Sequence, residues 1–194
     1  MKKYIVEAFG TFVLTSAVCL SLVGKFPVST PVLAGLVIVL FVYTVGHISG
    51  AHFNPAITLG AWSIKKIQSM EAFWYLVAQF AGSALALLLV MNTVGLPTLT
   101  VSMNWMTAFA EFLGTLLFGF GVASLLYNKV PHDFTGVVAG GSLLLGISIA
   151  ALLGSNGVLN PAVALGIGSF NLVYAIAPIV GSVVGMNFYN YLNK

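Results

Sequence analysis

The sequence predicts an all-α membrane protein in which six spanning helices surround two short re-entrant half-helices arranged as an inverted repeat. Of its 194 residues, 59% are hydrophobic and only 6% are charged, whereas soluble domains average about 25% charged residues. Six apolar segments approach the roughly 20 residues that a helix needs to cross a bilayer. Two copies of Asn-Pro-Ala, at 54–56 and 160–162, lie between them in apolar, Gly-containing stretches that are too short to span.

The expected spanning helices lie at about 4–23, 32–49, 70–91, 106–127, 134–153 and 172–191. The first contains Glu7 and lacks a small-x-small cleavage site, so we interpret it as a retained helix rather than a signal peptide. With a cytoplasmic N-terminus, six of the seven lysines fall inside and only Lys25 falls outside, as the positive-inside rule requires. The sequence thus predicts a multi-pass protein with both termini in the cytoplasm, and its short loops favour a microbial inner membrane.

The two halves of the chain repeat each other. Glu7-x-x-Gly10-Thr11 in the first predicted helix recurs as Glu111-x-x-Gly114-Thr115 in the fourth, and Asn54 recurs as Asn160. With three spanning helices in each half, the second copy must enter the membrane upside down. We therefore expect a single channel domain, 1–194, built from the inverted repeats 1–103 and 104–194.

Each Asn-Pro-Ala is a helix start, because Asn is a good N-cap and Pro is preferred at the first helical position. The helices expected at about 55–63 and 161–169 span roughly half of a 30 Å hydrocarbon core. Their N-termini meet near the midplane, where each carries about half a positive charge and disfavours cations. The Asn oxygen caps its own helix, so we expect its NH2 donors to face a water-filled path and to orient a water that cannot relay protons.

The run from Gly46 to Gly60, with the second Asn160-Pro161-Ala162 and the repeated Glu-x-x-Gly-Thr, resembles the aquaporins and aquaglyceroporins (major intrinsic proteins) over essentially the whole chain. The resemblance implies one pore per subunit, a homotetramer, and Glu7 and Glu111 accepting hydrogen bonds from backbone N–H groups of the re-entrant loops. It also implies a ladder of pore carbonyls from Gly50, Ala51, His52, Asn156, Gly157 and Val158.

The chain departs from the family at the outer constriction. The Arg that usually follows the second Asn-Pro-Ala is Val163 here, and the chain contains no Arg. The usual second-helix aromatic aligns with Ala34, the loop position is Gly157, and the fifth-helix position is Leu153 or, as the other candidate, Ser148. A wider, less polar constriction predicts passage of water and small neutral solutes of the glycerol, urea or ammonia type.

Other classes of protein fit less well. A coupled secondary transporter also has inverted repeats and broken helices, but it needs an ionisable residue at the midplane, where this chain offers Asn; a non-conducting structural member stays an alternative. No catalytic set, cofactor or nucleic-acid partner is predicted, and the expected partners are water, small neutral solutes and lipid. His47 and His52 straddle the break at Gly50 with no further ligand nearby, so we expect no metal site; pH gating by either, or by His132, stays open.

Overall fold

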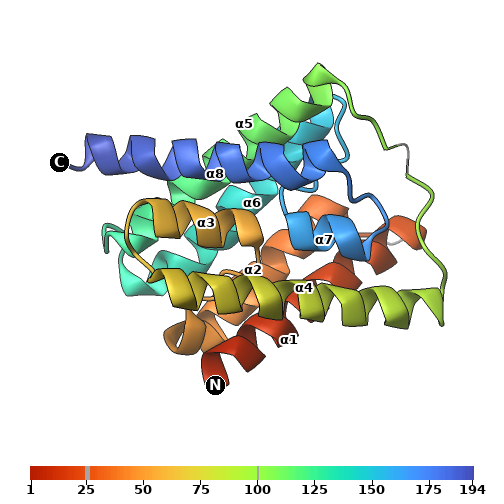
Figure 1. Ribbon diagram of the computed structural model, residues 1–194, viewed down its shortest axis with the longest axis horizontal. Coiled ribbons are helices and arrows are strands. Elements are labelled where there is room, and N and C mark those ends of the chain that lie inside the picture. Colours follow the sequence, from red (N-terminus) through yellow and green to blue (C-terminus); the bar gives the residue numbers. More distant parts are fainter. Residues whose placement is uncertain (25–26, 100) are drawn as a thin grey trace.

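The chain is all-helical in the computed structural model, which describes residues 1–24, 27–99 and 101–194 (Figure 1). Six segments in these ranges are long and apolar enough to cross a membrane, which confirms the predicted fold class. Lys25, used above to orient the chain, lies outside the described residues. The six long helices are α1 (Lys2–Val23), α2 (Thr30–Ser49), α4 (Ser69–Met91), α5 (Trp105–Leu126), α6 (Thr135–Leu152) and α8 (Leu172–Leu192).

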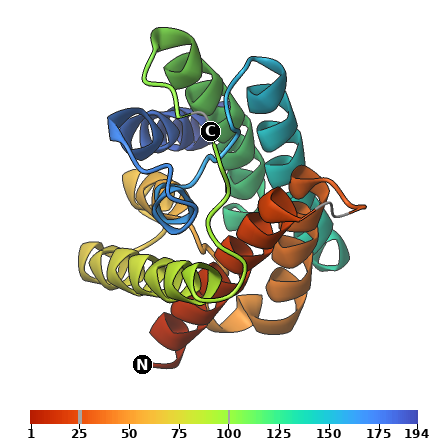
Figure 2. The ribbon, with the colours of Figure 1, turned by 90° about the vertical axis from the view of Figure 1, so that its right-hand side faces the viewer.

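Two short helices, α3 (Pro55–Ser63) and α7 (Pro161–Gly166), lie between α4 and α8 (Figures 1 and 2). A single 3₁₀ turn, η1 (His132–Phe134), precedes α6. The bounds of α3 match the prediction, whereas α7 is shorter than the expected 161–169. It stops because Gly168 adopts a left-handed φ of 72°, and the Ser169 N–H turns back to the Ala164 carbonyl.

The helix contacts follow the same pattern in the two halves of the chain. α1 packs against α2 and α4 as α5 packs against α6 and α8, and α3 contacts α8 as α7 contacts α4. Of the contacts between long helices, the one between α2 and α6 stays the same pair when the two halves are exchanged. These helices cross at Gly35 and Gly140. A Cβ at Gly140 would lie only 2.4 Å from the Gly35 carbonyl oxygen. These two glycines let the halves meet backbone to backbone.

Polarity is distributed as in a membrane protein. Large apolar side chains such as Leu36, Leu85 and Leu145 are exposed on the outer surface of the bundle, whereas Glu7 and Glu111 are fully buried inside it. In water this arrangement would be unfavourable, but lipid solvates the apolar surface and leaves polar groups to pair within the bundle. The interior between the long helices is therefore where functional chemistry is to be found.

Candidate functional site

The two Asn-Pro-Ala segments cap α3 and α7 in the way that the sequence predicts. Asn54 and Asn160 have extended backbones and precede the first helical prolines. The Asn54 Oδ1 accepts from the Ala56 N–H at 2.8 Å, and the Asn160 Oδ1 accepts from the N–H groups of Ala162 and Val163 at 3.0 and 3.2 Å. Each side chain thus satisfies amides that a helix start leaves unpaired.

Each asparagine also binds the opposite loop. The Asn54 Nδ2 donates to the Leu159 carbonyl, and the Asn160 Nδ2 donates to the Phe53 carbonyl, both at 2.9 Å. We expected both N–H bonds of each amide to face the lumen, but one is spent on this reciprocal link. A primary amide has two N–H bonds, so one donor per asparagine remains for the lumen.

Glu7 holds the first loop from inside α1. Its Oε1 accepts from the Ser49 hydroxyl at 2.7 Å and from the His52 N–H at 3.0 Å. Its Oε2 accepts from the Phe53 N–H at 2.7 Å and from the Gln79 Nε2 at 2.8 Å. Four donors on a fully buried carboxyl compensate for its removal from water.

Glu111 holds the second loop in the same register. It accepts from the Ser155 hydroxyl, from the Val158 N–H at 2.9 Å and from the Leu159 N–H at 2.7 Å. Ser155 precedes its asparagine by the same number of residues as Ser49 does in the first loop. Their hydroxyls also accept from a loop amide in each case, the Ala51 and Gly157 N–H groups at 3.1 and 3.3 Å.

These bonds determine where the loop carbonyls point. In a trans peptide the C=O is directed opposite to the N–H, and the peptides of both loops are trans. Because the N–H groups turn towards the buried glutamates and serines, the carbonyls turn away from them. Two cavities adjoin the loops: Gly50, Ala51 and His52 of the first loop line one, and Asn156, Gly157 and Val158 of the second loop, together with His52, line the other.

The residue before each asparagine is held in an unfavourable conformation. Phe53 and Leu159 have φ values of 49° and 54°, the left-handed region that costs a non-glycine residue about 1 kcal/mol or more. Both are fully buried and pack on the glycine of the repeated Glu-x-x-Gly-Thr. A Cβ at Gly10 would lie 2.2 Å from the Phe53 ring, and one at Gly114 would lie 2.8 Å from the Leu159 side chain. The motif therefore supplies both an acceptor and the space that its loop needs.

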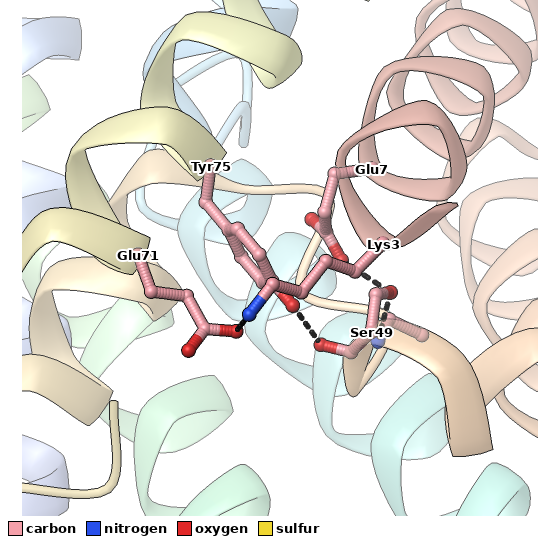
Figure 3. Close-up of polar contacts among 6 residues, drawn as sticks. Lys3, Glu7, Ser49, Glu71 and Tyr75 are labelled. Carbon is pink, nitrogen blue, oxygen red and sulfur yellow. Dashed lines mark hydrogen bonds and ion pairs between the residues drawn. The ribbon is translucent and has the colours of Figure 1, made fainter. Parts of the chain in front are cut away.

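Sequence reasoning missed a tyrosine beside each loop. The Tyr75 hydroxyl donates to the Ser49 carbonyl at 2.7 Å (Figure 3), and the Tyr174 hydroxyl accepts from the Asn156 Nδ2 at 3.0 Å. Figure 3 also shows Lys3 reaching towards Glu71 near Tyr75. Tyr75, Tyr174 and Gln79 resemble ordinary helix residues, whereas the matched serines before the two asparagines are a signal that could have been found.

One cavity, of about 210 Å³, contains the predicted constriction residues Ala34, Gly157 and Val163; we name it the Val163 cavity. Leu153 is not among its lining residues, and the Ser148 hydroxyl donates to the Leu144 carbonyl of its own helix. The residues that α6 contributes are Leu143, Ile147 and Ala151, spaced four apart on one helix face. Leu153 caps the end of α6 instead, and neither fifth-helix candidate lines this cavity.

The other cavity, of about 400 Å³, opens at the far end of the bundle and is named the His47 cavity. His47, Asn128 and His132 line it, at the ends of α2 and α5 and in η1. The two cavities share the lining residues Ile38, His52 and Phe118, which we call the neck. Among the described residues, no group of three or more His, Cys, Asp or Glu side chains could hold a metal ion.

Comparison with known proteins identifies relatives along nearly the whole chain. The family model described as Major intrinsic protein matches residues 1–189. The chain is 34% identical to Nodulin-26 of Glycine max, with 98% of this chain and 77% of that protein aligned. It is 29% identical to Aquaporin Z of Bradyrhizobium diazoefficiens, covering 100% and 94%. The X-ray structure of the aquaglyceroporin from Plasmodium falciparum superposes with a TM-score of 0.71, 22% identity, and coverage of 99% and 96%.

Proposed function

The chain belongs to the major intrinsic protein family, the family of the aquaporin channels, and from this premise we propose that it conducts water together with small neutral solutes of the glycerol, urea or ammonia type. It is a multi-pass membrane channel and not an enzyme. The proposed path runs through the Val163 cavity, the neck and the His47 cavity, and the two cavities share the three neck residues. Conduction is passive, down the gradient of the solute.

The observation that carries the solute class is the wall of the Val163 cavity. Where a selective water channel has bulky side chains and an arginine, this chain has Ala34, Gly157 and Val163, and it contains no arginine. A cavity of about 210 Å³ exceeds the roughly 10–15 Å³ that one water needs on the same measure of volume. Loop carbonyls on one wall, facing apolar side chains on the others, suit a solute that has hydrogen-bond donors on one edge.

Proton and cation exclusion is assigned to the neck. The N-termini of α3 and α7 meet beside it, where Asn54 and Asn160 line the Val163 cavity, and each favours negative over positive charge. The remaining N–H bonds of Asn54 and Asn160 orient a water with its oxygen towards them, which breaks a proton relay along the file. Without an arginine in the Val163 cavity, cation exclusion depends on these groups alone.

The surroundings of the channel are part of the proposal. With the His47 cavity in the cytoplasm, both chain termini and the lysines at 2, 3, 65, 66, 129 and 194 face inside, as the positive-inside rule favours. The subunit is a single domain of two inverted repeats, 1–103 and 104–194, and it assembles as a homotetramer with one pore per subunit. A microbial inner membrane is the proposed location.

The test is stopped-flow swelling of proteoliposomes under water, glycerol, urea and ammonia gradients, comparing the wild type with Val163→Arg. We expect the wild type to pass water and at least one of the larger solutes, and the variant to lose the larger solutes while it keeps water. Planar bilayers should show no potassium current. Water conduction with every other solute blocked, a large potassium current, or saturable uptake driven by a second gradient would each overturn the proposal.

A further inference from the structure

A chain of hydrogen bonds leads from Glu7 to the neck. The Gln79 Nε2 donates to the Glu7 Oε2 at 2.8 Å and to the Thr58 Oγ1 at 2.9 Å. The Thr58 Oγ1 in turn lies 3.1 Å from the Nδ1 of His52. Glu7, Thr58 and Gln79 are fully buried, and His52 is 7% exposed. The first three groups have no exposed surface, so their hydrogen bonds are made within the protein.

The direction of this chain is set by the donor and acceptor types. The carboxyl of Glu7 requires the amide nitrogen of Gln79 on its side, because an amide oxygen there would face the carboxyl oxygen. Gln79 then donates to Thr58, and the Thr58 hydroxyl proton is left for the His52 Nδ1. An Nδ1 that accepts leaves a neutral imidazole with its proton on Nε2.

Gln79 shows that this arrangement has a cost. Its own Oε1 is buried with no hydrogen-bond partner among the described residues. An unpaired buried acceptor is unfavourable, and such groups are rare enough in folded proteins to require an explanation. Gln79 donates one N–H bond to Glu7 and the other to Thr58, while its oxygen stays unpaired. A Gln in this arrangement is suited to orienting its neighbours.

The Nε2 edge of the ring is the one left for the lumen, since the Nδ1 edge contacts Thr58. His52 lines both the Val163 cavity and the His47 cavity, and a Cβ placed on Gly50 would lie 3.4 Å from its Cδ2 and Nε2. The opposite edge is occupied by Thr58, and the ring contacts Tyr75 edge to face with centroids 5.4 Å apart. The other two neck residues, Ile38 and Phe118, offer no polar side chain.

We propose that Thr58 and Gln79 are positioning residues that hold His52 as the Nε2–H tautomer, so that a third N–H donor faces the lumen at the neck, next to those of Asn54 and Asn160 in the Val163 cavity. This inference rests on the pore proposed above. It makes the neck asymmetric. Counting from the asparagine in each repeat, the second loop has Val158 in place of His52 and α7 has Ala164 in place of Thr58.

The consequence is a specific role in permeation. Water and solutes pass loop carbonyls that only accept, and they need donors where the carbonyls end. His52 supplies an N–H donor at the neck, where the other two lining side chains, Ile38 and Phe118, are apolar. A permeant with an acceptor oxygen is therefore stabilised at the neck, and removing the donor should slow water passage about fivefold, the effect of one unmade neutral hydrogen bond.

The experiment is ¹⁵N NMR of the histidine rings in lipid-reconstituted full-length protein, with the His52 signals assigned from their absence in His52→Asn. We expect an unprotonated Nδ1 and a protonated Nε2 in the wild type. Thr58→Val and Gln79→Met should each redistribute the proton towards Nδ1. Thr44→Val is the matched control, because the Thr44 hydroxyl only donates to the Leu40 carbonyl of its own helix.

Stopped-flow water permeability of the same samples, normalised to folded protein, should fall about fivefold in Thr58→Val and stay at the wild-type level in Thr44→Val. A wild-type His52 protonated on Nδ1, or tautomer signals unchanged in both network variants, would overturn the positioning role. A shifted tautomer with unchanged permeability would overturn the donor role. If the wild type conducts nothing while the NMR result holds, the proposed function fails and the network stands.

Discussion

Replacing Glu111 by Gln tests whether this buried carboxyl serves only as an acceptor for the second loop. Gln presents one oxygen where Glu111 presents two. When the Gln oxygen takes the place of the Glu111 Oε1, it accepts from the Ser155 hydroxyl and the Val158 N–H. The Gln NH2 group then takes the place of Oε2 and faces the Leu159 N–H. Two buried donors then lack an acceptor, and at roughly 1–3 kcal/mol each the loss of stability is about 2–6 kcal/mol.

Glu71→Gln is the matched control, since it makes the same chemical change at a carboxyl near the bundle surface. Glu71 is paired with Lys3, and their side chains are 28% and 33% exposed. Ion pairs in such positions contribute about 0–1 kcal/mol. The difference between the two variants therefore isolates the burial and the loop contacts of Glu111.

The assay is the free energy of unfolding in mixed micelles, followed by tryptophan fluorescence, together with proteoliposome flux over a range of pH. We expect Glu111→Gln to lose stability and flux while the pH dependence of the remaining flux is unchanged. A variant within about 1 kcal/mol of the wild type would refute the hydrogen-bond argument. A change in the pH dependence would instead indicate a proton-coupling carboxyl, as in a transporter.

Two further changes address the loop supports. Gly10→Ala should cost about 1–3 kcal/mol by overpacking, because the new Cβ would lie 2.2 Å from the buried Phe53 ring; a variant as stable as the wild type in the same micelle assay would show that the ring has room to move. Tyr174→Phe removes the hydroxyl that accepts from the Asn156 Nδ2 and, at 3.4 Å, from the Asn156 N–H and should cost about 1 kcal/mol; hydrogen exchange should report a faster backbone amide at Asn156, and unchanged exchange would contradict a supporting role.

The fold was largely predictable because its strongest signals are local. Six apolar segments of spanning length are visible in composition alone, and each Asn-Pro pair indicates where a half-helix begins. The end of α7 was less visible, because Gly166 resembles Gly60 in sequence but is followed by Gly168 in a left-handed conformation. A helix end set by one backbone dihedral leaves little trace in hydropathy.

The site was predictable where it repeats and unpredictable where it depends on packing. Glu7 and Glu111 were found because they recur in a shared motif. Ile147 and Ala151 were missed because the rotation of α6 about its axis decides which residues face the cavity, and hydrophobicity all round the helix hides that rotation. Gln79 was missed because its partners come from other helices, far from it in sequence.

The reciprocal bonds between the two loops explain how the constriction can vary while the midplane is preserved. Asn54 and Asn160 each bind the opposite loop, and each loop is anchored by the glutamate of its own half. The side chains of Ala34 and Val163 carry no hydrogen-bonding group, so none of these bonds depends on them. Having Val163 in place of a cationic side chain at the constriction therefore alters the size and polarity of the Val163 cavity without disturbing the helix caps. In the channel proposed here, solute choice and the central ion barrier are therefore assigned to different residues.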